Sequence, residues 1–336
     1  MSPPSRGHSK EGVYAGRRIL VIGASGFIGR WVSAALAGQG ALVSALVRDP
    51  AKVPTEIGEA SGISLVPGDV ERRTELADSI AEVMADLRPS VTFNLVGYGV
   101  RPGQDDPGTA ERLNTDFVGR LMKVAADVRD DDWPGNAVVH AGSQAEYGPL
   151  TQLEESQDPE PVSLYGRTKL AGTRLAARCA RDTGLPAVVA RVFNVYGPGE
   201  PAHRLLPTLI RRAADEDPID LTSCVQERDF VFVRDVADAM LRLGAASPLQ
   251  GEPVNIATGR PIPLRELVLS AAQQLQISPE RLRFGALPDR PLEVPSPAVS
   301  ARRLRELTGW SPATSLEVGI RETVANARQS MSAEQR

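Results

Sequence analysis

A tyrosine and a lysine with the spacing of a proton-transfer pair stand in the segment Ser163-Leu-Tyr-Gly-Arg-Thr-Lys169. Tyr165 and Lys169 are four residues apart, so they share one face of a predicted helix. A phenol has a pKa of about 10, and a nearby ammonium favours the phenolate. We therefore expect Lys169 to lower the pKa of Tyr165. A packed tyrosine and a solvated lysine on an amphipathic helix would show the same spacing.

A second motif is the glycine-rich turn formed by Gly23, Gly26 and Gly29. The apolar run at 19–22 predicts a buried parallel strand before this turn, and a helix is expected after it. Glycines let the backbone turn sharply, and free N–H groups at a helix start bind a pyrophosphate. The motif therefore indicates a dinucleotide site. Its spacing is GxxGxxG rather than GxGxxG, and the glycines could instead serve only close packing of strand and helix.

A third signal is Ser143, which follows the apolar run 137–141 and so stands near a predicted strand end. The glycine turn, this serine and the YxxxK pair, in this order and separation, resemble the extended short-chain dehydrogenase/reductases, particularly their nucleotide-sugar branch. The resemblance covers roughly residues 17–330. It is also carried by Asp69-Val70 after Gly68, Asn114, Arg191-Val-Phe-Asn-Val-Tyr-Gly-Pro-Gly199, Glu227-Arg-Asp-Phe-Val-Phe-Val-Arg-Asp-Val236 and Gly309-Trp-Ser-Pro312.

The resemblance implies roles for single residues. Ser143 would hydrogen-bond the reacting oxygen, Tyr165 would exchange a proton with it, and Lys169 would also hold the nicotinamide ribose. Asp69 and Val70 would flank the adenine. The other cofactor contacts are expected from the glycine turn and two strand ends: Gly23, Ser25, Gly26, Phe27, Ile28, Gly29, Leu95, Val96 and Phe193.

Apolar runs alternate with helical patterns through the N-terminal part of the chain. This alternation predicts an α/β fold with a Rossmann-type doubly wound parallel sheet. Beyond Gly197 the pattern is irregular and rich in proline, which indicates a smaller substrate-binding lobe. Strands are expected at 18–22, 42–47, 63–66, 91–96, 137–141 and 187–193, and helices at 27–37, 74–87, 109–128 and 164–181.

The chain is expected to have three parts. Residues 1–16 lack the apolar core of a signal peptide and are expected to form a disordered tail. Residues 17–196 would form the dinucleotide-binding domain, to which a segment near 230–258 returns, and 197–330 would form the substrate-binding lobe. No run approaches the roughly 18 apolar residues of a membrane span, so no span is expected. The low cysteine count suits a cytoplasmic protein.

Composition narrows the classes of partner. The formal net charge is −4 with both signs interspersed, so no nucleic-acid partner is expected. Cys179 and Cys224 are too few for a disulfide framework or a zinc cluster, which suits a reducing compartment. No metal site is expected, and His140 and His203 are interpreted as structural because no second ligand stands at metal spacing.

The end of the second predicted strand bears on the choice of cofactor. NAD-dependent relatives usually place an acid there, whereas this chain has Val47 followed by Arg48. Arg48, together with Arg30 after the last glycine, could clamp a 2′-phosphate, which a carboxylate would repel. We therefore expect NADP(H) to be preferred over NAD(H). The alternatives are a one-residue shift that places Asp49 on the ribose, and a merely solvated turn.

Two residues after the serine narrow the reaction. Sugar 4,6-dehydratases of this family carry Asp-Glu there, whereas this chain has Gln144-Ala145. Alanine exchanges no proton, so dehydration by the usual route is not expected. By resemblance, Asn194, Arg228 and Arg290 would bind a nucleoside diphosphate and Gln144 would contact the substrate, although each could instead be structural.

The predicted function is NADPH-dependent reduction of the C4 ketone of a nucleotide-linked 4-keto-6-deoxyhexose. A nucleotide-sugar 4-epimerase is the alternative, and NADP preference favours the reductase because such epimerases usually hold NAD. A non-catalytic dinucleotide sensor is a third hypothesis, although it would not need the set of Ser143, Tyr165 and Lys169.

A homodimer is expected, because family members pair through the helices that correspond to 109–128 and 164–181. The same side chains could instead face only the sheet. The stripe that would form the interface consists of Leu121, Val124, Ala125, Leu170, Ala171 and Leu175.

Overall fold

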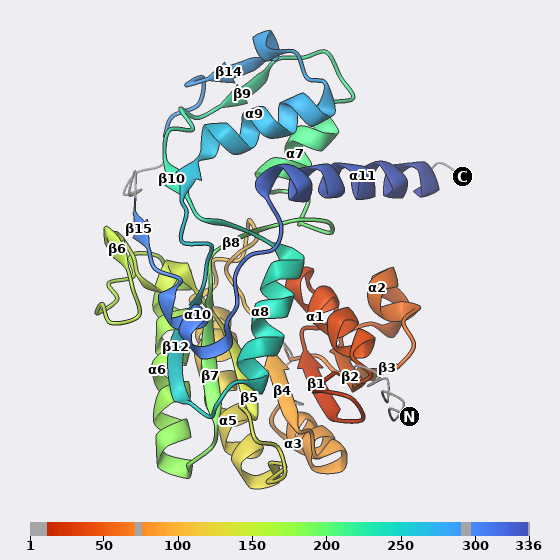
Figure 1. Cartoon of the computed structure of the whole chain (residues 1–336), viewed down its shortest axis with the longest axis vertical. Coiled ribbons are helices and arrows are strands. Elements are labelled where there is room, and N and C mark those ends of the chain that lie inside the picture. The colour runs from red at the N-terminus through yellow and green to blue at the C-terminus, as the bar shows by residue number, and fades with distance from the viewer. Residues whose placement is uncertain (1–11, 71–75, 290–296, 335–336) are drawn as a thin grey trace, which may run out of the picture.

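The computed structural model describes residues 12–70, 76–289 and 297–334, and Figure 1 shows a sheet-based unit with a smaller lobe above it. Seven parallel strands form the central sheet, in the order β12-β7-β5-β4-β1-β2-β3. The order reverses between β1 and β4, where doubly wound sheets open a crevice. The strands are β1 (Arg18–Ile22), β2 (Leu42–Val47), β3 (Ile63–Pro67), β4 (Val91–Asn94), β5 (Val138–Ser143), β7 (Ala187–Val192) and β12 (Gln250–Ile256).

Helices cover both faces of this sheet. Ile19 and Val21 of β1 belong to one buried core, and Leu20 and Ile22 belong to the other. Four consecutive apolar residues are buried because a parallel strand with both faces covered meets no water. The helices on the first face are α1 (Phe27–Gly38) and α8 (Val233–Ala245), and those on the second are α3 (Leu76–Leu87), α5 (Phe117–Val128) and α6 (Leu164–Thr183).

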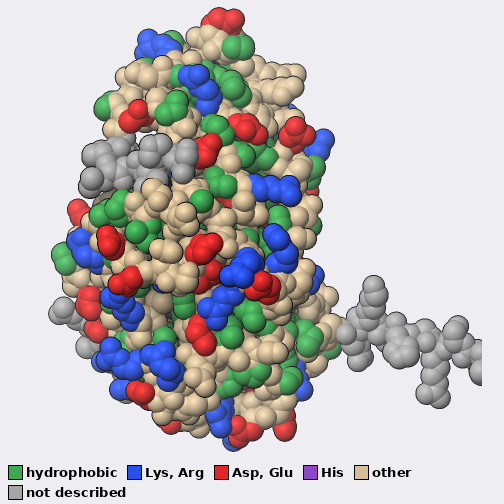
Figure 2. Space-filling view, turned by 60° about the vertical axis from the view of Figure 1, so that its left-hand side comes forward, with side chains coloured by type: hydrophobic (Ala, Val, Ile, Leu, Met, Phe, Trp, Pro, Cys, Tyr) green, Lys and Arg blue, Asp and Glu red, His purple; other side chains and the backbone are tan. Residues whose placement is uncertain are grey.

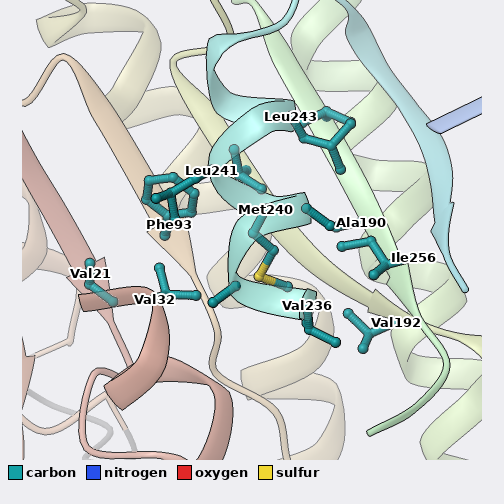
Figure 3. Close-up of a cluster of buried hydrophobic side chains, with 14 of the residues drawn as sticks. Val21, Val32, Phe93, Ala190, Val192, Val236, Met240, Leu241, Leu243 and Ile256 are labelled. Atoms are coloured by element: carbon teal, nitrogen blue, oxygen red, sulfur yellow. The ribbon is translucent and has the colours of Figure 1, made fainter. Parts of the chain in front are cut away.

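The core around α8 joins a late segment of the chain to the sheet. Figure 3 shows Met240 of α8 among Val32, Ala190 and Ile256, which come from α1, β7 and β12. Met240 and Ile256 are fully buried. The segment near 230–258 thus supplies both a covering helix and the edge strand of the sheet.

The smaller lobe has a core of its own, to which Leu209, Val268 and Ile320 each contribute from a different helix. In contrast, Leu304 and Trp310 pack in the same core as α8. The C-terminal part therefore contributes to both units. A single lobe was expected at 197–330, but the segment around Leu304 and Trp310 packs against the sheet-based unit. The lobe contains α7 (Leu205–Arg212), β9 (Ile219–Leu221), α9 (Leu264–Leu275), β14 (Leu282–Phe284) and α11 (Leu316–Glu334), whereas α10 (Arg302–Thr308) lies on α8.

Short elements complete the fold. Strand β8 pairs in parallel with β11, and β10 pairs antiparallel with β13. These elements are η1 (Pro50–Lys52), α2 (Thr55–Gly58), α4 (Pro107–Glu111), the π-helical turn η2 (Arg112–Asp116), η3 (Gln144–Glu146), β6 (Gln152–Leu153), β8 (Asn194–Tyr196), β10 (Glu227–Arg228), β11 (Phe230–Phe232), β13 (Ile262–Pro263), η4 (Pro279–Arg281) and β15 (Ala298–Val299).

The predicted strands and helices are confirmed, with differences at their ends. The strand predicted at 91–96 ends at Asn94, because the Val96 N–H turns back to donate to the Asn94 side chain at 3.3 Å. The helix predicted at 109–128 is broken by the π-helical turn η2. The start of the helix predicted at 74–87 lies outside the described residues, and α3 runs from Leu76 to Leu87.

The tail prediction is wrong for its last residues, while residues 1–11 lie outside the described part. Tyr14 is fully buried, and its hydroxyl donates to the Leu241 carbonyl of α8 at 2.6 Å. Its ring stacks on Trp133 with centroids 5.3 Å apart. A single aromatic residue, Tyr14, thus anchors this segment. The prediction failed because it used the overall composition, which is rich in small and charged residues.

Charged side chains of both signs are mixed over the face presented in Figure 2. None of the described helices is long and apolar enough to cross a lipid bilayer. Within the described ranges, His, Cys, Asp and Glu side chains form no cluster of three that could hold a metal ion.

Candidate active site

A cavity of about 670 Å³ opens where β1, β4, β5 and β7 end. This is the carboxyl edge of the parallel strands, next to the reversal of strand order, where ligands bind in sheets of this type. Its walls bring together most residues that the sequence predicted for the site: Gly23, Gly26, Phe27, Ile28, Gly29, Leu95, Val96, Ser143, Gln144, Tyr165, Lys169, Phe193 and Asn194.

The glycine turn fits a pyrophosphate. Gly23 has a φ of +81°, which favours glycine, and a Cβ there would press on the Leu95 backbone at 3.2 Å. A Cβ on Gly29 would lie 2.1 Å from the Gly23 carbonyl oxygen. Helix α1 begins after Gly26 without a side-chain cap, so its first N–H groups are left for another acceptor. A dinucleotide phosphate suits them in charge and geometry.

Local caps set the positions of the three candidate catalytic residues. Ser143 ends β5 and caps η3, where its hydroxyl accepts from the Ala145 N–H at 3.2 Å. Ser163 caps α6 by accepting from the Gly166 N–H at 3.0 Å. Tyr165 therefore stands in the first turn of α6 and Lys169 one turn later. The predicted strand end and helix are both present.

Burial governs the protonation of these residues. It raises the pKa of Tyr165, which the hydrogen bond from Ser143 lowers. It also lowers the pKa of Lys169 to about 8, against the raising effect of Glu146. The Lys169 ammonium donates to the Ala141 carbonyl at 2.5 Å. The expected lowering of the Tyr165 pKa by Lys169 is not found, because burial dominates and the ammonium is directed at this carbonyl instead.

Asn114 joins the loop after β4 to α6. Its side chain donates to the Tyr98 carbonyl and to the Thr168 hydroxyl, both at 2.9 Å, and accepts from the Tyr98 N–H at 2.9 Å. Asn114 is fully buried within the π-helical turn. One buried amide in the π-helical turn therefore ties the loop after β4 to α6.

Two amide side chains, Gln144 and Asn194, pair in the wall of the cavity. The Gln144 side-chain amide donates to Oδ1 of Asn194 at 2.8 Å, and Nδ2 of Asn194 donates back to Oε1 of Gln144 at 3.3 Å. The Asn194 backbone N–H donates to the Asp229 carbonyl at 3.1 Å. Both residues line the cavity. The sequence predicted each of them as a substrate contact, but it did not predict that they are hydrogen-bonded to each other.

The predicted adenine end lies at the edges of β2 and β3. The Gly68 N–H donates to the Val47 carbonyl at 2.9 Å, which brings Arg48 and Asp69 to adjacent strand ends. The Asp49 carboxylate accepts from the Ala51 N–H at 3.0 Å and lies 3.4 Å from Lys52. Asp49 therefore caps η1, whereas Arg48 is exposed beside it.

Several predicted site residues lie outside the cavity wall. The Arg30 guanidinium lies 3.9 Å from Glu56 and against Gly199. Arg228 is partly buried and donates to its neighbour's carbonyl at 2.6 Å. Arg290 lies outside the described residues. The predicted residues that do not line the cavity are Ser25, Arg30, Arg48, Asp69, Val70 and Arg228.

The structure adds residues that the sequence reasoning missed. Arg101 and Arg204 line the cavity, and with Lys169 they are the charged residues among its described walls. All three are basic, so the cavity favours an anionic ligand. Arg204 also lowers the pKa of Tyr165. His203, interpreted from sequence as structural, lines the cavity as well.

Comparison with known proteins agrees with this geometry. The model of the NAD dependent epimerase/dehydratase family matches residues 19–257. The chain is 30% identical over 316 residues to dTDP-6-deoxy-L-talose 4-dehydrogenase (NAD(P)(+)) of Kitasatospora kifunensis, covering 91% of this chain and 94% of that protein. It is 27% identical over 342 residues to UDP-glucuronate 4-epimerase 4 of Arabidopsis thaliana, covering 92% of this chain and 75% of that protein.

A solved structure has a similar fold over most of the chain. MoeE5 in complex with UDP-glucuronic acid and NAD matches with a TM-score of 0.78 and 28% identity, covering 93% of this chain and 99% of that one. The family match spans both the glycine turn and the YxxxK helix. On these grounds the chain belongs to the NAD-dependent epimerase/dehydratase family of the extended short-chain dehydrogenase/reductases.

Proposed function

We propose that this nucleotide-sugar-modifying enzyme is a 4-ketoreductase that acts, with NADPH, on a nucleotide-linked 4-keto-6-deoxyhexose. The observation that carries the proposal is one basic cavity that holds the glycine turn, Ser143, Tyr165 and Lys169. The 4-dehydrogenase relative supports redox chemistry at this sugar carbon. Bound NADPH would supply the hydride.

The protein's part is to hold the ketone and deliver a proton. Hydride arrival at C4 leaves an alkoxide, which must be protonated. The Tyr165 phenol carries its proton at neutral pH, which burial reinforces by raising the pKa, and it can protonate the far more basic alkoxide. Ser143 would hydrogen-bond the same oxygen, and Lys169, which also lines the cavity, would bind the nicotinamide ribose. Gln144 and Asn194 would contact the sugar and its diphosphate.

Alanine at position 145 argues against dehydration. Gln144 and Ala145 both line the cavity. The two positions after Ser143 therefore present an amide and a methyl group. Neither exchanges a proton at sugar C5 or C6. Chemistry at one carbinol carbon is therefore the reaction that this wall supports.

The reductase is separated from the epimerase by the need for external reductant. We expect the purified protein to oxidise NADPH with at least one member of a panel of nucleotide-linked 4-keto sugars, followed by the loss of NADPH absorbance. Interconversion of nucleotide hexoses at C4 without added NADPH would instead show the epimerase, which the Arabidopsis thaliana relative makes the second candidate. Binding of NADPH without either reaction would favour the sensor.

Only part of the predicted dimer interface lies at the surface of the single chain. Leu121 and Ala125 are buried in the core beneath this face of the sheet, so this part of the stripe faces the sheet, whereas the buried Leu170 lines a surface groove along α6. Ala171 and Leu175 are half-buried and line a surface groove of about 690 Å³ along α6. The part of the stripe that remains available for pairing is therefore narrower than the sequence suggested.

We expect a homodimer through this groove, with a sedimentation mass of two chains at micromolar concentration. Ala171→Glu should shift the protein toward single chains, because it places a larger, charged side chain in the contact. Leu269→Glu, on exposed Leu269 of α9, is the matched control and should leave the mass unchanged. A single-chain mass for the unaltered protein contradicts the proposal.

A further inference from the structure

One buried carboxylate joins three elements beneath the candidate catalytic residues. Glu146 is completely buried. One of its oxygens accepts from the Ser143 N–H at 2.8 Å, and the other accepts from the Thr173 hydroxyl at 3.0 Å and the Arg191 guanidinium at 2.9 Å. These donors belong to the end of β5, to α6 and to β7. Glu146 is thus a direct bridge between the segment of Ser143 and the helix of Tyr165.

The bridge depends on a charge pair with no access to water. The side chains of Glu146 and Arg191 are 0% and 3% exposed. Arg191 also lies over the Tyr147 ring, 4.6 Å from its centroid. A buried carboxylate is tolerated when hydrogen bonds and an opposite charge compensate it, and removing that compensation is strongly unfavourable. The donors around Glu146 therefore hold it, and the segments that carry them, in one arrangement.

We propose that Glu146 is a positioning residue, which sets the Ser143 hydroxyl against the Tyr165 phenol by tying β5, α6 and β7 to one carboxylate. Thr173 stands one helical turn after Lys169, so its bond to Glu146 also fixes the rotation of α6 about its axis. The assignment of Tyr165 as the acid rests on the proposed function, whereas the bridge itself rests on the contacts.

The charge of Glu146 acts on the same residues. It raises the pKa of Tyr165 and that of Lys169, and Arg204, from the segment before α7, opposes it at Tyr165. Ser143 faces the phenol from β5, and Arg191 faces Glu146 from β7. Removing the negative charge should therefore let both Tyr165 and Lys169 lose their protons at lower pH. A reductase that needs the protonated phenol would then lose activity at a lower pH.

The variant Glu146→Gln removes this charge and keeps the shape of the side chain. We expect kcat to fall by about tenfold or more, because small displacements of reacting groups cost one to two orders of magnitude. At a pH well below the Lys169 pKa of about 8, where the ammonium persists, the KM for NADPH should change little, since Glu146 does not line the cavity. The alkaline limb of the kcat profile should move to lower pH. A folded Glu146→Gln variant with unchanged kcat and pH profile overturns the inference.

A spectroscopic titration tests the inference without any substrate. Tyrosinate absorbance is measured against pH, and the contribution of Tyr165 is obtained by subtracting the same titration of a Tyr165→Phe variant. In the Glu146→Gln background, with its own Tyr165→Phe blank, this transition should lie at lower pH. A loss of kcat with no movement of the transition indicates a purely structural role and overturns the inference.

Controls separate positioning from general loss of stability. Asp235→Asn removes another buried carboxylate, which accepts from the Thr314 N–H and hydroxyl at 3.0 and 3.1 Å and does not line the cavity. It should lower stability and leave both the pH profile and the tyrosinate transition in place. If Glu146→Gln does not fold, Thr173→Val decides: lower kcat with unchanged NADPH affinity supports the bridge, and unchanged kcat overturns it.

The outcomes also distinguish this inference from the proposed function. A wild-type protein that turns over no sugar in the panel contradicts the reductase, and the tyrosinate titration still decides the role of Glu146. Wild-type turnover together with an unmoved transition in Glu146→Gln contradicts only the positioning role.

Discussion

Replacing Tyr165 with phenylalanine is expected to lower turnover by about a hundredfold or more, while NADPH affinity stays nearly constant. The change removes only the phenolic oxygen and leaves the ring, the α6 helix and the glycine turn in place. Tyr165 is the acid that we place beside the reacting oxygen, and its raised pKa keeps the proton available. Steady-state kinetics with the best substrate, together with a direct titration of NADPH, would measure both effects.

The matched control for this variant is Tyr14→Phe. Tyr14 is also buried, but its hydroxyl donates to the Leu241 carbonyl on the α8 side of the sheet. Its loss should cost about 1 kcal/mol of folding free energy and leave turnover unchanged. Ser143→Ala should cause a smaller loss of turnover than Tyr165→Phe, and Lys169→Met should damage both turnover and cofactor binding. Full activity of Tyr165→Phe would contradict the mechanism and favour the sensor.

The features that the sequence predicted well have local causes. The glycine turn can be predicted because its conformation is determined by residues that are close in sequence. Gly23 adopts a positive φ, and Gly29 passes close to the Gly23 carbonyl. The face shared by Tyr165 and Lys169 follows from the period of one helix. Apolar runs such as 19–22 predict strands because both sheet faces are covered.

The features that the sequence missed depend on contacts between distant segments. Arg204 enters the cavity from the loop before α7, and no spacing rule relates it to Tyr165. Glu146 stands among residues that were recognised, yet its role depends on Arg191, 45 residues later. Strand β12 was expected only as part of a returning segment, because Gly251, Glu252 and Pro253 interrupt its apolar pattern.

The pKa expectation for Tyr165 failed for a related reason. Sequence spacing predicts that Lys169 is near, but it predicts neither the burial of the phenol nor the Ala141 carbonyl that takes the ammonium. In the fold, burial and Glu146 raise the Tyr165 pKa, whereas Ser143 and Arg204 lower it. The Tyr165 pKa therefore depends on these four contributions together, and the phenol keeps its proton at neutral pH.

Replacing Arg48 with alanine is expected to weaken NADPH binding by about ten- to hundredfold, and NADH binding far less. Only NADPH carries the 2′-phosphate that the guanidinium would neutralise, and a charge-assisted pair of this kind contributes roughly 1.5–3 kcal/mol. Arg48 follows β2 at the edge where the adenosine would lie, next to the Asp69 end of β3. Arg30 contributes less to this expectation, since Glu56 lies beside its guanidinium.

The alternative, Asp49 on the ribose, has its own variant. Asp49→Asn keeps a side-chain oxygen that can accept from the Ala51 N–H, so the cap of η1 survives while the charge is lost. If Arg48 decides the cofactor, Asp49→Asn should leave NADH affinity unchanged, because the carboxylate is occupied by this cap and by Lys52. Equal weakening of both cofactors in Arg48→Ala, with loss of NADH affinity in Asp49→Asn, would contradict the NADP preference. Asp49 would then be the residue that binds the ribose.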